Sequence, residues 1–226
     1  VFVTEPVSSS SEAIFNLPVL LEAGGTLRLA TNALLDLGCS AQSLTIEGAL
    51  DLRPGSRLRV DGCNAKTLTL APGATADWLG TLRFDGGHAF RVEDAFEIGG
   101  ELFLSGGPGI AGAGSLTVTE SGLIRWDTSA TVGVPLTVNG TASLDSSGVT
   151  VVVNAAFTLG PSGVLGNPGQ FRVGSFTDLG GTIVGNPPVL LPPGGAPALL
   201  GLTLHDPPTP RATLLGRSLP AGPGLV

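Results

Sequence analysis

The feature that most constrains the fold is a repeat that brings the only two cysteines into one phase. "LGCSAQSLTI" at 37–46 matches "DGCNAKTLTL" at 61–70 at an offset of 24 residues, which places Cys39 on Cys63. The same offset aligns "RLRVDG" at 57–62 with "TLRFDG" at 81–86. Self-similarity at a fixed period of this size is typical of solenoids and other repeat architectures.

Three series of short alternating strands follow one another within each repeat. The first series reads SLTI, TLTL, AFRV, SLTV, PLTV and AFTL, starting at residues 43, 67, 89, 115, 135 and 156. The second series includes "ALDL" at 49–52, and the third includes "RLRV" at 57–60. Turn residues separate the strands. We expect "GGPGIAGAG" at 106–114 to bulge out as an enlarged corner.

This pattern predicts an all-β fold in which the chain winds around itself. Period-2 alternation places Leu44 and Ile46 on one face of a strand and Thr45 on the other. Three short strands per coil of about 20–26 residues describe a single-stranded parallel β-solenoid of the right-handed β-helix type. An antiparallel sandwich or barrel is the alternative, but it would not place the cysteines in register.

The repeat divides the chain into three parts. Residues 1–22 lie outside it and are expected to form an N-terminal cap or a strand that pairs with a neighbouring molecule. Residues 23–185 are expected to form the solenoid. Residues 186–226 are rich in both Pro and Leu, which indicates an extended arm packed on its own solenoid or on the next subunit. A linker to a further domain would have a similar composition.

Cys39 and Cys63 are predicted to form a disulfide, because stacked coils would bring them to about the strand spacing. Two reduced, buried thiols are the alternative. The disulfide, the absence of methionine and the single lysine favour an extracellular or cell-surface location.

Composition argues against several classes of function. The chain has 11 basic and 18 acidic residues, so it lacks the positive charge that nucleic acid binding requires. It contains no apolar run of transmembrane length. Two cysteines without a nearby histidine are too few ligands for a metal, and we expect no cofactor.

The candidate catalytic groups do not assemble into a recognisable site. Asp61 and Asp85 share a phase, and stacked carboxylates can serve acid–base chemistry or hold Ca²⁺. However, Asp-Gly after a strand is also ordinary turn chemistry. His88 and His205 lie far apart in sequence, and His88 is expected in a turn. We therefore expect no enzymatic activity, and a β-helix polysaccharide lyase or hydrolase is the least favoured alternative.

A threonine ladder is expected on the outer side of the first strand series, interrupted by Arg91. Threonine suits exposed strand positions, so the ladder has a structural explanation, although a flat threonine array can also bind an ordered ligand. Its members are Thr45, Thr69, Thr117, Thr137 and Thr158.

The stretches "SLTIEGALDLRPGSRLRVDG" and "PLTVNGTASLDSSGVTVVVN" resemble repeats of bacterial secreted right-handed β-helix proteins. Filamentous-haemagglutinin-like adhesins and autotransporter passengers are the nearest such families, and the resemblance covers residues 24–185. It implies a secreted adhesin or structural stalk. We expect a structural subunit of an extracellular filament that associates with itself through the solenoid ends and the terminal arms. An adhesin or stalk that binds surface glycans is the alternative.

Overall fold

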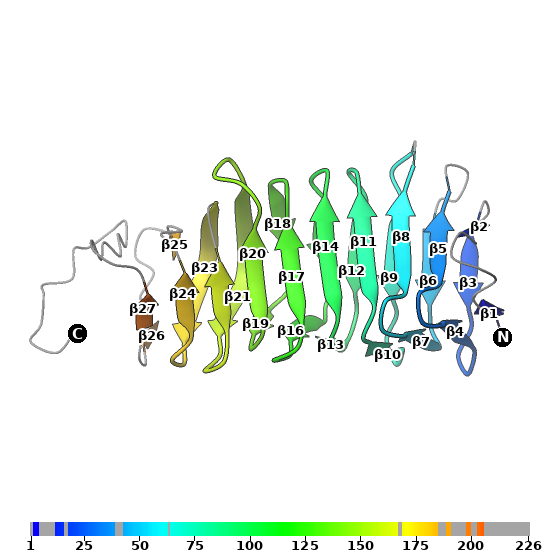
Figure 1. The fold of residues 1–226 in the computed structure, drawn as a ribbon, viewed down its shortest axis with the longest axis horizontal. Coiled ribbons are helices and arrows are strands. Elements are labelled where there is room, and N and C mark those ends of the chain that lie inside the picture. The colour runs from blue at the N-terminus through cyan, green and yellow to red at the C-terminus, as the bar shows by residue number, and fades with distance from the viewer. Residues whose placement is uncertain are drawn as a thin grey trace, which may run out of the picture.

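The computed structural model is a parallel β-solenoid, which confirms the predicted fold class (Figure 1). It describes residues 2–4, 12–15, 18–38, 43–62, 64–166, 169–184, 189–190, 198–199 and 203–205. Throughout these ranges the paired strands run parallel, and no helix occurs.

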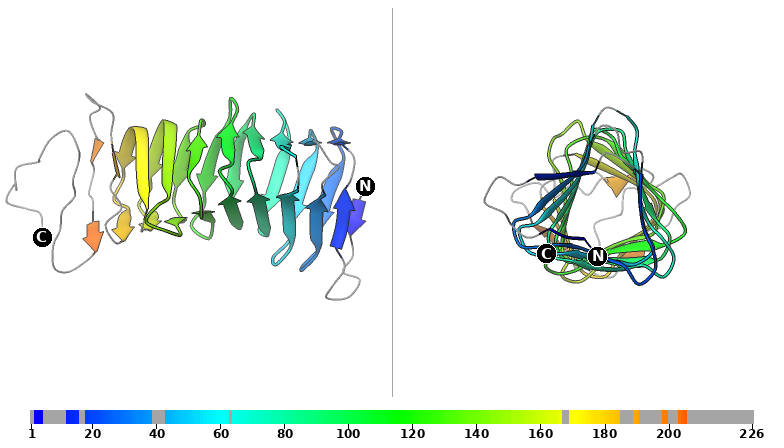
Figure 2. Two further views of the ribbon diagram at one scale, coloured as in Figure 1. Left: turned by 90° about the horizontal axis from the view of Figure 1, so that it is seen from above. Right: turned by 90° about the vertical axis from the view of Figure 1, so that its right-hand side faces the viewer.

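Each coil contributes one strand to each of three faces, which enclose a triangular cross-section in the end-on view (Figure 2). Face A contains β1 (Phe2–Thr4), β4 (Thr26–Leu29), β7 (Ala49–Leu52), β10 (Thr75–Trp78), β13 (Ala95–Ile98), β16 (Ser115–Val118), β19 (Leu136–Val138) and β26 (Ala198–Leu199). Face B contains β2 (Glu12–Phe15), β5 (Leu34–Leu37), β8 (Arg57–Asp61), β11 (Thr81–Asp85), β14 (Glu101–Ser105), β17 (Leu123–Trp126), β20 (Thr141–Leu144), β22 (Val164–Gly166), β24 (Thr182–Val184) and β27 (Thr203–His205).

Face C contains β3 (Val19–Leu21), β6 (Ser43–Ile46), β9 (Thr67–Leu70), β12 (Ala89–Val92), β15 (Gly109–Ala111), β18 (Ala130–Val132) and β25 (Val189–Leu190). Two longer strands, β21 (Thr150–Leu159) and β23 (Gln170–Asp178), turn the corner from face C to face A without a break. On face A, β13 continues from β10, because the Gly99 N–H donates to the Trp78 carbonyl at 3.0 Å.

The core is a stack of inward side chains from successive coils. Leu44 lies beside Leu68, which lies beside Phe90, and all three are fully buried. Removing such a side chain from water stabilises the fold by about 1.5–3 kcal/mol. A single coil buries little of this surface, so each coil depends on the next.

The stretch at 106–114, which was expected to be a bulged corner, contains strand β15. Its Ile110 is 2% exposed and lies between Phe90 and Val132 on face C. Because this strand was not counted, the sequence-based assignment of later strands is wrong by one face. "SLTV" at 115–118 belongs to face A, whereas "SLTI" at 43–46 belongs to face C.

Strands also occur in both terminal segments. β1, β2 and β3 pair with β4, β5 and β6, so they form the first coil. β25 and β26 pair with β23, and β27 pairs with β24. The domain boundaries 1–22, 23–185 and 186–226 otherwise stay predictions.

Candidate functional site

The structure divides the expected threonine ladder between two faces. Thr45 and Thr69 lie side by side on face C, where the next coil supplies Arg91. On face A, Thr117, Thr137 and Thr158 form a separate row. The single ladder interrupted by an arginine was therefore a wrong expectation, caused by the uncounted strand β15.

The row on face A is unbroken and gains a member that the sequence analysis missed. Thr158 lies beside Thr177 of β23, so the row runs over four consecutive coils. Its charged neighbour is Glu97, which lies beside Thr117 and is exposed. The second outward position of the same four coils carries only small side chains: Ser115, Pro135, Ala156 and Ser175.

Face B carries an array of ion pairs that joins consecutive coils. Asp61 and Asp85 lie side by side, as the sequence predicts. Arg59 contacts both, with 2.6 Å between its Nη2 and Asp61 Oδ2 and 2.8 Å between its Nε and Asp85 Oδ2. Arg83 also donates to Asp85 at 2.6 Å. These carboxylates are therefore held by arginines from two coils.

The electrostatics of Asp85 favour a bridging role over acid catalysis. Burial alone would raise the pKa of Asp85, but hydrogen bonds from Arg83 and Arg59 outweigh burial and hold that pKa below its usual value. A general acid of a glycosidase needs a raised pKa, so that its carboxyl is protonated near neutral pH. Asp85 thus fits an ionised bridge between β8 and β11.

Asp51 in β7 occupies an outward position by strand alternation, yet it is only 6% exposed. It accepts a hydrogen bond from Arg28 Nε at 2.5 Å and from Arg53 Nη2 at 2.9 Å. Arg28 belongs to the preceding coil and lies beside Asp51, so it shields the carboxylate from solvent. Alternation within one strand does not predict this burial.

Phe103 points outward on face B and yet is nearly buried. Its ring lies between the guanidinium groups of Arg83 and Arg125, at 4.5 Å and 4.8 Å from the ring centroid. Cations over both sides of the ring leave no free aromatic surface on which a sugar could stack. Phe103 therefore contributes to the coil-to-coil contacts.

Two ionisable side chains are buried at the corner between faces B and C. Lys66, the only lysine, is 1% exposed, and its Nζ donates to the carbonyl oxygens of Leu37, at 2.6 Å, and of Asp61. His88, expected in a turn, does lie at a corner, but its ring is only 3% exposed. The Lys66 backbone N–H donates to His88 Nδ1 at 3.3 Å. Lys66 shares the inward phase of Leu68 and Leu70, a signal that could have identified it as buried.

The structure leaves two other predicted elements untested. Cys39 and Cys63 lie outside the described residues, so the disulfide stays a prediction. In sequence, each cysteine falls between a strand of face B and a strand of face C. These flanking strands belong to consecutive coils, because β5 pairs with β8 and β6 pairs with β9. His205 lies in β27, and its side chain is outside the described part of the chain.

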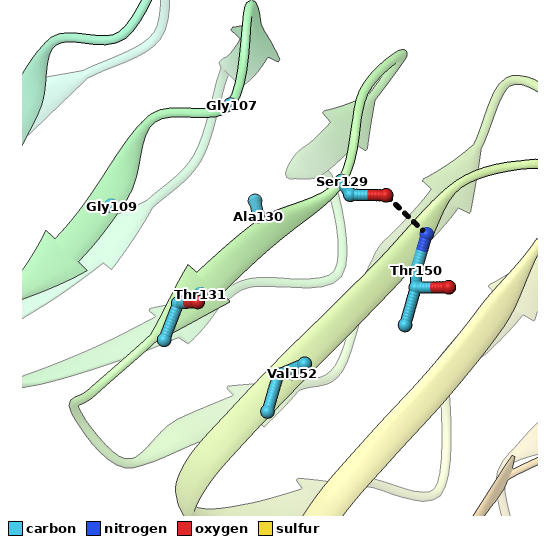
Figure 3. A pocket seen from close by; sticks show the side chains of 7 residues that line it. All are labelled: Gly107, Gly109, Ser129, Ala130, Thr131, Thr150 and Val152. Atoms are coloured by element: carbon cyan, nitrogen blue, oxygen red, sulfur yellow. Dashed lines mark hydrogen bonds between the residues drawn. The ribbon is translucent and has the colours of Figure 1, made fainter.

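A shallow depression of about 270 Å³ lies on face C, beside the glycines that precede and begin β15 (Figure 3). Gly107 and Gly109 leave the space, and hydroxyls of Thr131 and Thr150 border it. Ser129 Oγ accepts a hydrogen bond from the Thr150 N–H at 2.9 Å (Figure 3). The lining supplies hydroxyls but no ionisable side chain, so it contains no general base that could activate one of them.

Within the described ranges, no three His, Cys, Asp or Glu side chains gather closely enough to hold a metal ion. The same ranges contain no helix of the length and apolarity needed to cross a membrane. Comparison with protein-family models, curated proteins and solved structures finds no match to this chain. The resemblance to adhesin and autotransporter repeats therefore stays an expectation, and the function must be argued from the geometry.

Proposed function

We propose that this protein is a non-enzymatic structural subunit of an extracellular or cell-surface fibre, in which solenoids join end to end. The observation that carries the proposal is that the strands of both terminal coils have one edge without a pairing partner among the described residues. At the N-terminal end, β1, β2 and β3 each pair on one side only among the described residues. At the other end, β25, β26 and β27 each pair on one side only, as far as the described residues extend.

Unpaired strand edges are templates for adding another strand. Because all strands run parallel, the last coil of one copy can stack on the first coil of the next without reversing direction. Such a contact joins two different surfaces, and it repeats without closing on itself, which generates a filament. Each of the three sheets would continue across the junction at the usual strand spacing of about 4.8 Å.

Four of the six edge strands lack the charged residues and prolines with which natural sheets prevent such pairing. Lysine, proline and inward charges normally protect exposed edges. β1, β3, β25 and β26 contain no charged residue and no proline. Their sequences therefore favour pairing with a further strand.

Exposed aliphatic side chains collect near the ends of the solenoid. Ile14 and Leu20, in the first coil, are 52% and 56% exposed. Leu179 and Val184, near the other end, are each 42% exposed, and among the described residues only Leu79 is a large exposed aliphatic elsewhere. Apolar surface at both ends supports burial by a neighbouring molecule.

A proline at the free edge tests this proposal. The Glu47 N–H donates to the Leu21 carbonyl at 2.8 Å, so the backbone groups of Leu21 face β6, and those of Leu20 alternate toward the free edge. Leu20→Pro should remove an edge donor without breaking the pairing to β6. Leu20→Ala, the matched control, keeps the donor.

We expect negative-stain microscopy to show fibres one solenoid wide for the unchanged chain and for Leu20→Ala. Leu20→Pro should give separate short rods with an unchanged circular dichroism spectrum. Monodisperse short rods of the unchanged chain at high concentration would contradict the proposal, as would fibres of Leu20→Pro equal in length to those of the control.

A second function, an adhesin or carbohydrate-binding stalk, is favoured by the unbroken threonine row on face A. Thr117→Lys with Thr137→Lys would place two charges in the row, whereas Thr45→Lys with Thr69→Lys is a matched pair on face C. We expect a glycan-binding protein to lose at least about tenfold in affinity, roughly 1.4 kcal/mol, only with the first pair. Equal binding by both double variants in glycan-array and insoluble-polysaccharide assays would reject the row as the site.

A further inference from the structure

Lys66 and His88 occupy inward positions that later coils fill with apolar side chains. They immediately precede β9 and β12, whose first residues, Thr67 and Ala89, lie side by side. By the same register, the following coils place buried residues at this position: Pro108, Ala130, Val151 and Phe171. The interior thus changes from ionisable to apolar within one corner of the solenoid.

The contacts of the two side chains require His88 to be neutral. Nδ1 accepts the Lys66 N–H at 3.3 Å, and a ring nitrogen can accept only when it carries no proton. Nε2 is buried and meets no acceptor or donor in full hydrogen-bond geometry among the described residues, although the Asp85 backbone lies near enough to the ring to favour its protonated form. It faces Gly86, where an added Cβ would lie 3.1 Å from Nε2, so any side chain at position 86 would press on the ring.

The charges around His88 oppose its protonation. Burial, followed by repulsion from the Lys66 ammonium group, lowers the pKa of His88 below its ordinary value. The carboxylates of Asp61 and Asp85 and the Asp85 backbone act in the other direction. Both carboxylates are already neutralised by Arg59, and Asp85 also by Arg83.

Lys66 connects the His88 ring to the C-terminal ends of β5 and β8. Burial lowers the pKa of Lys66, while Asp36 and Asp61 raise it. Its ammonium group holds the carbonyls of Leu37 in β5 and Asp61 in β8, and its backbone holds His88 after β11. One residue therefore joins three consecutive coils.

We propose that the Lys66–His88 corner is an acid-sensitive lock, which holds the coils of β5, β8 and β11 together while His88 is neutral and releases them when it is protonated. A proton on Nδ1 removes the acceptor for the Lys66 N–H and places a second buried cation beside the first. The lock acts within one chain, so the inference does not depend on the proposed fibre.

The sign of the pH dependence follows from linkage. The unfolded chain binds a proton at His88 with a pKa of about 6.5, and the folded chain resists that proton. Stability is therefore fully present above about pH 6.5 and falls as the pH decreases. The equilibrium constant for unfolding should rise by up to about tenfold for each pH unit below 6.5, until the lower folded pKa is reached.

Denaturant unfolding of the full chain between pH 7.5 and pH 5.0 tests the lock. Carboxylates titrate mainly below this window. We expect the unchanged chain to become less stable across the window and His88→Asn, whose side-chain oxygen can still accept the Lys66 N–H, to stay nearly constant. His205→Asn, which changes the only other histidine, should keep the original dependence. Equal pH dependence of His88→Asn and the unchanged chain would overturn the inference.

A second measurement needs no variant that might alter folding. Nuclear magnetic resonance of the histidine ring carbons in the unchanged chain would follow both histidines through the same window. We expect the His88 signals to titrate below pH 6.5, while the amides of Lys66 and Ala89 lose protection from exchange relative to the intrinsic exchange rate at each pH. A His88 pKa at or above 6.5, or amide exchange that does not change with its titration, would also overturn the lock.

Discussion

Arg59 in β8 and Asp85 in β11 form an ion pair between consecutive coils, with 2.8 Å between Nε and Oδ2. The register places Asp85 beside Asp61, which Arg59 also contacts. The outward side chains of face B therefore hold the coils together in addition to the apolar core.

We expect Asp85→Asn to lower the free energy of unfolding by about 1–3 kcal/mol at neutral pH, because the amide cannot accept charged hydrogen bonds from Arg59 and Arg83 equally well. The depressed pKa of Asp85 means that its contribution is present above the unfolded value of about 3.9 and is lost as the pH falls below it. Asp85→Asn should therefore lose less stability than the unchanged chain between pH 5 and pH 3.

Asp77→Asn is the matched control for this change. The Asp77 carboxylate is 53% exposed and lies 3.4 Å from Arg53 Nη1, and exposed pairs contribute about 0–1 kcal/mol. Chemical denaturation at each pH compares the two variants. Equal losses for Asp77→Asn and Asp85→Asn would contradict a special bridging role for Asp85.

Gly100→Ala should destabilise the solenoid by about 1–3 kcal/mol or more through overpacking. The coils approach closely at this corner, and a Cβ on Gly100 would lie only 2.1 Å from the Gly80 carbonyl oxygen. Gly148→Ala is the control, since nothing lies within 4 Å of its Cβ, and it should be neutral or slightly stabilising. Thermal unfolding distinguishes the two, and similar midpoints would show that the coils adjust to the added methyl group.

The predicted disulfide between Cys39 and Cys63 would close a loop of 24 residues and stabilise the chain by roughly 3 kcal/mol. Under oxidising conditions we expect no thiol to react with an alkylating agent until a reductant is added, as intact-mass measurement can show. Cys39→Ser should then leave one reactive thiol and lower the unfolding midpoint. Two thiols that react in the folded, unreduced chain would instead support the alternative of free cysteines.

The sequence predicts the fold class well because burial in a solenoid repeats in register. Leu44, Leu68 and Phe90 recur at one position of the repeat, and the structure stacks them in that order. Asp61 and Asp85 follow the same logic. All of these residues precede residue 106. In that part of the chain, segments with similar sequences also stack on one another in the structure.

The sequence predicts the candidate sites less well, because an alternating strand fits any of the three faces. "SLTV" at 115–118 resembles "SLTI" at 43–46, yet β15, within the glycine-rich stretch 106–114, takes the place on face C and moves Thr117 to face A. The contacts that Lys66 and His88 make likewise depend on how the corner turns. Backbone hydrogen bonds to the preceding coil decide both, and no single strand contains that information.

The order of apolar and polar residues along the chain by itself determined that this protein is a β-solenoid with three strands per coil, since only stacked coils bury a repeat of this kind. Only the tertiary structure decided which strands share a face, which threonines form one row and which charges are buried. Those properties depend on contacts between residues about 20 positions apart in consecutive coils, and the number of residues in each corner decides which residues are paired.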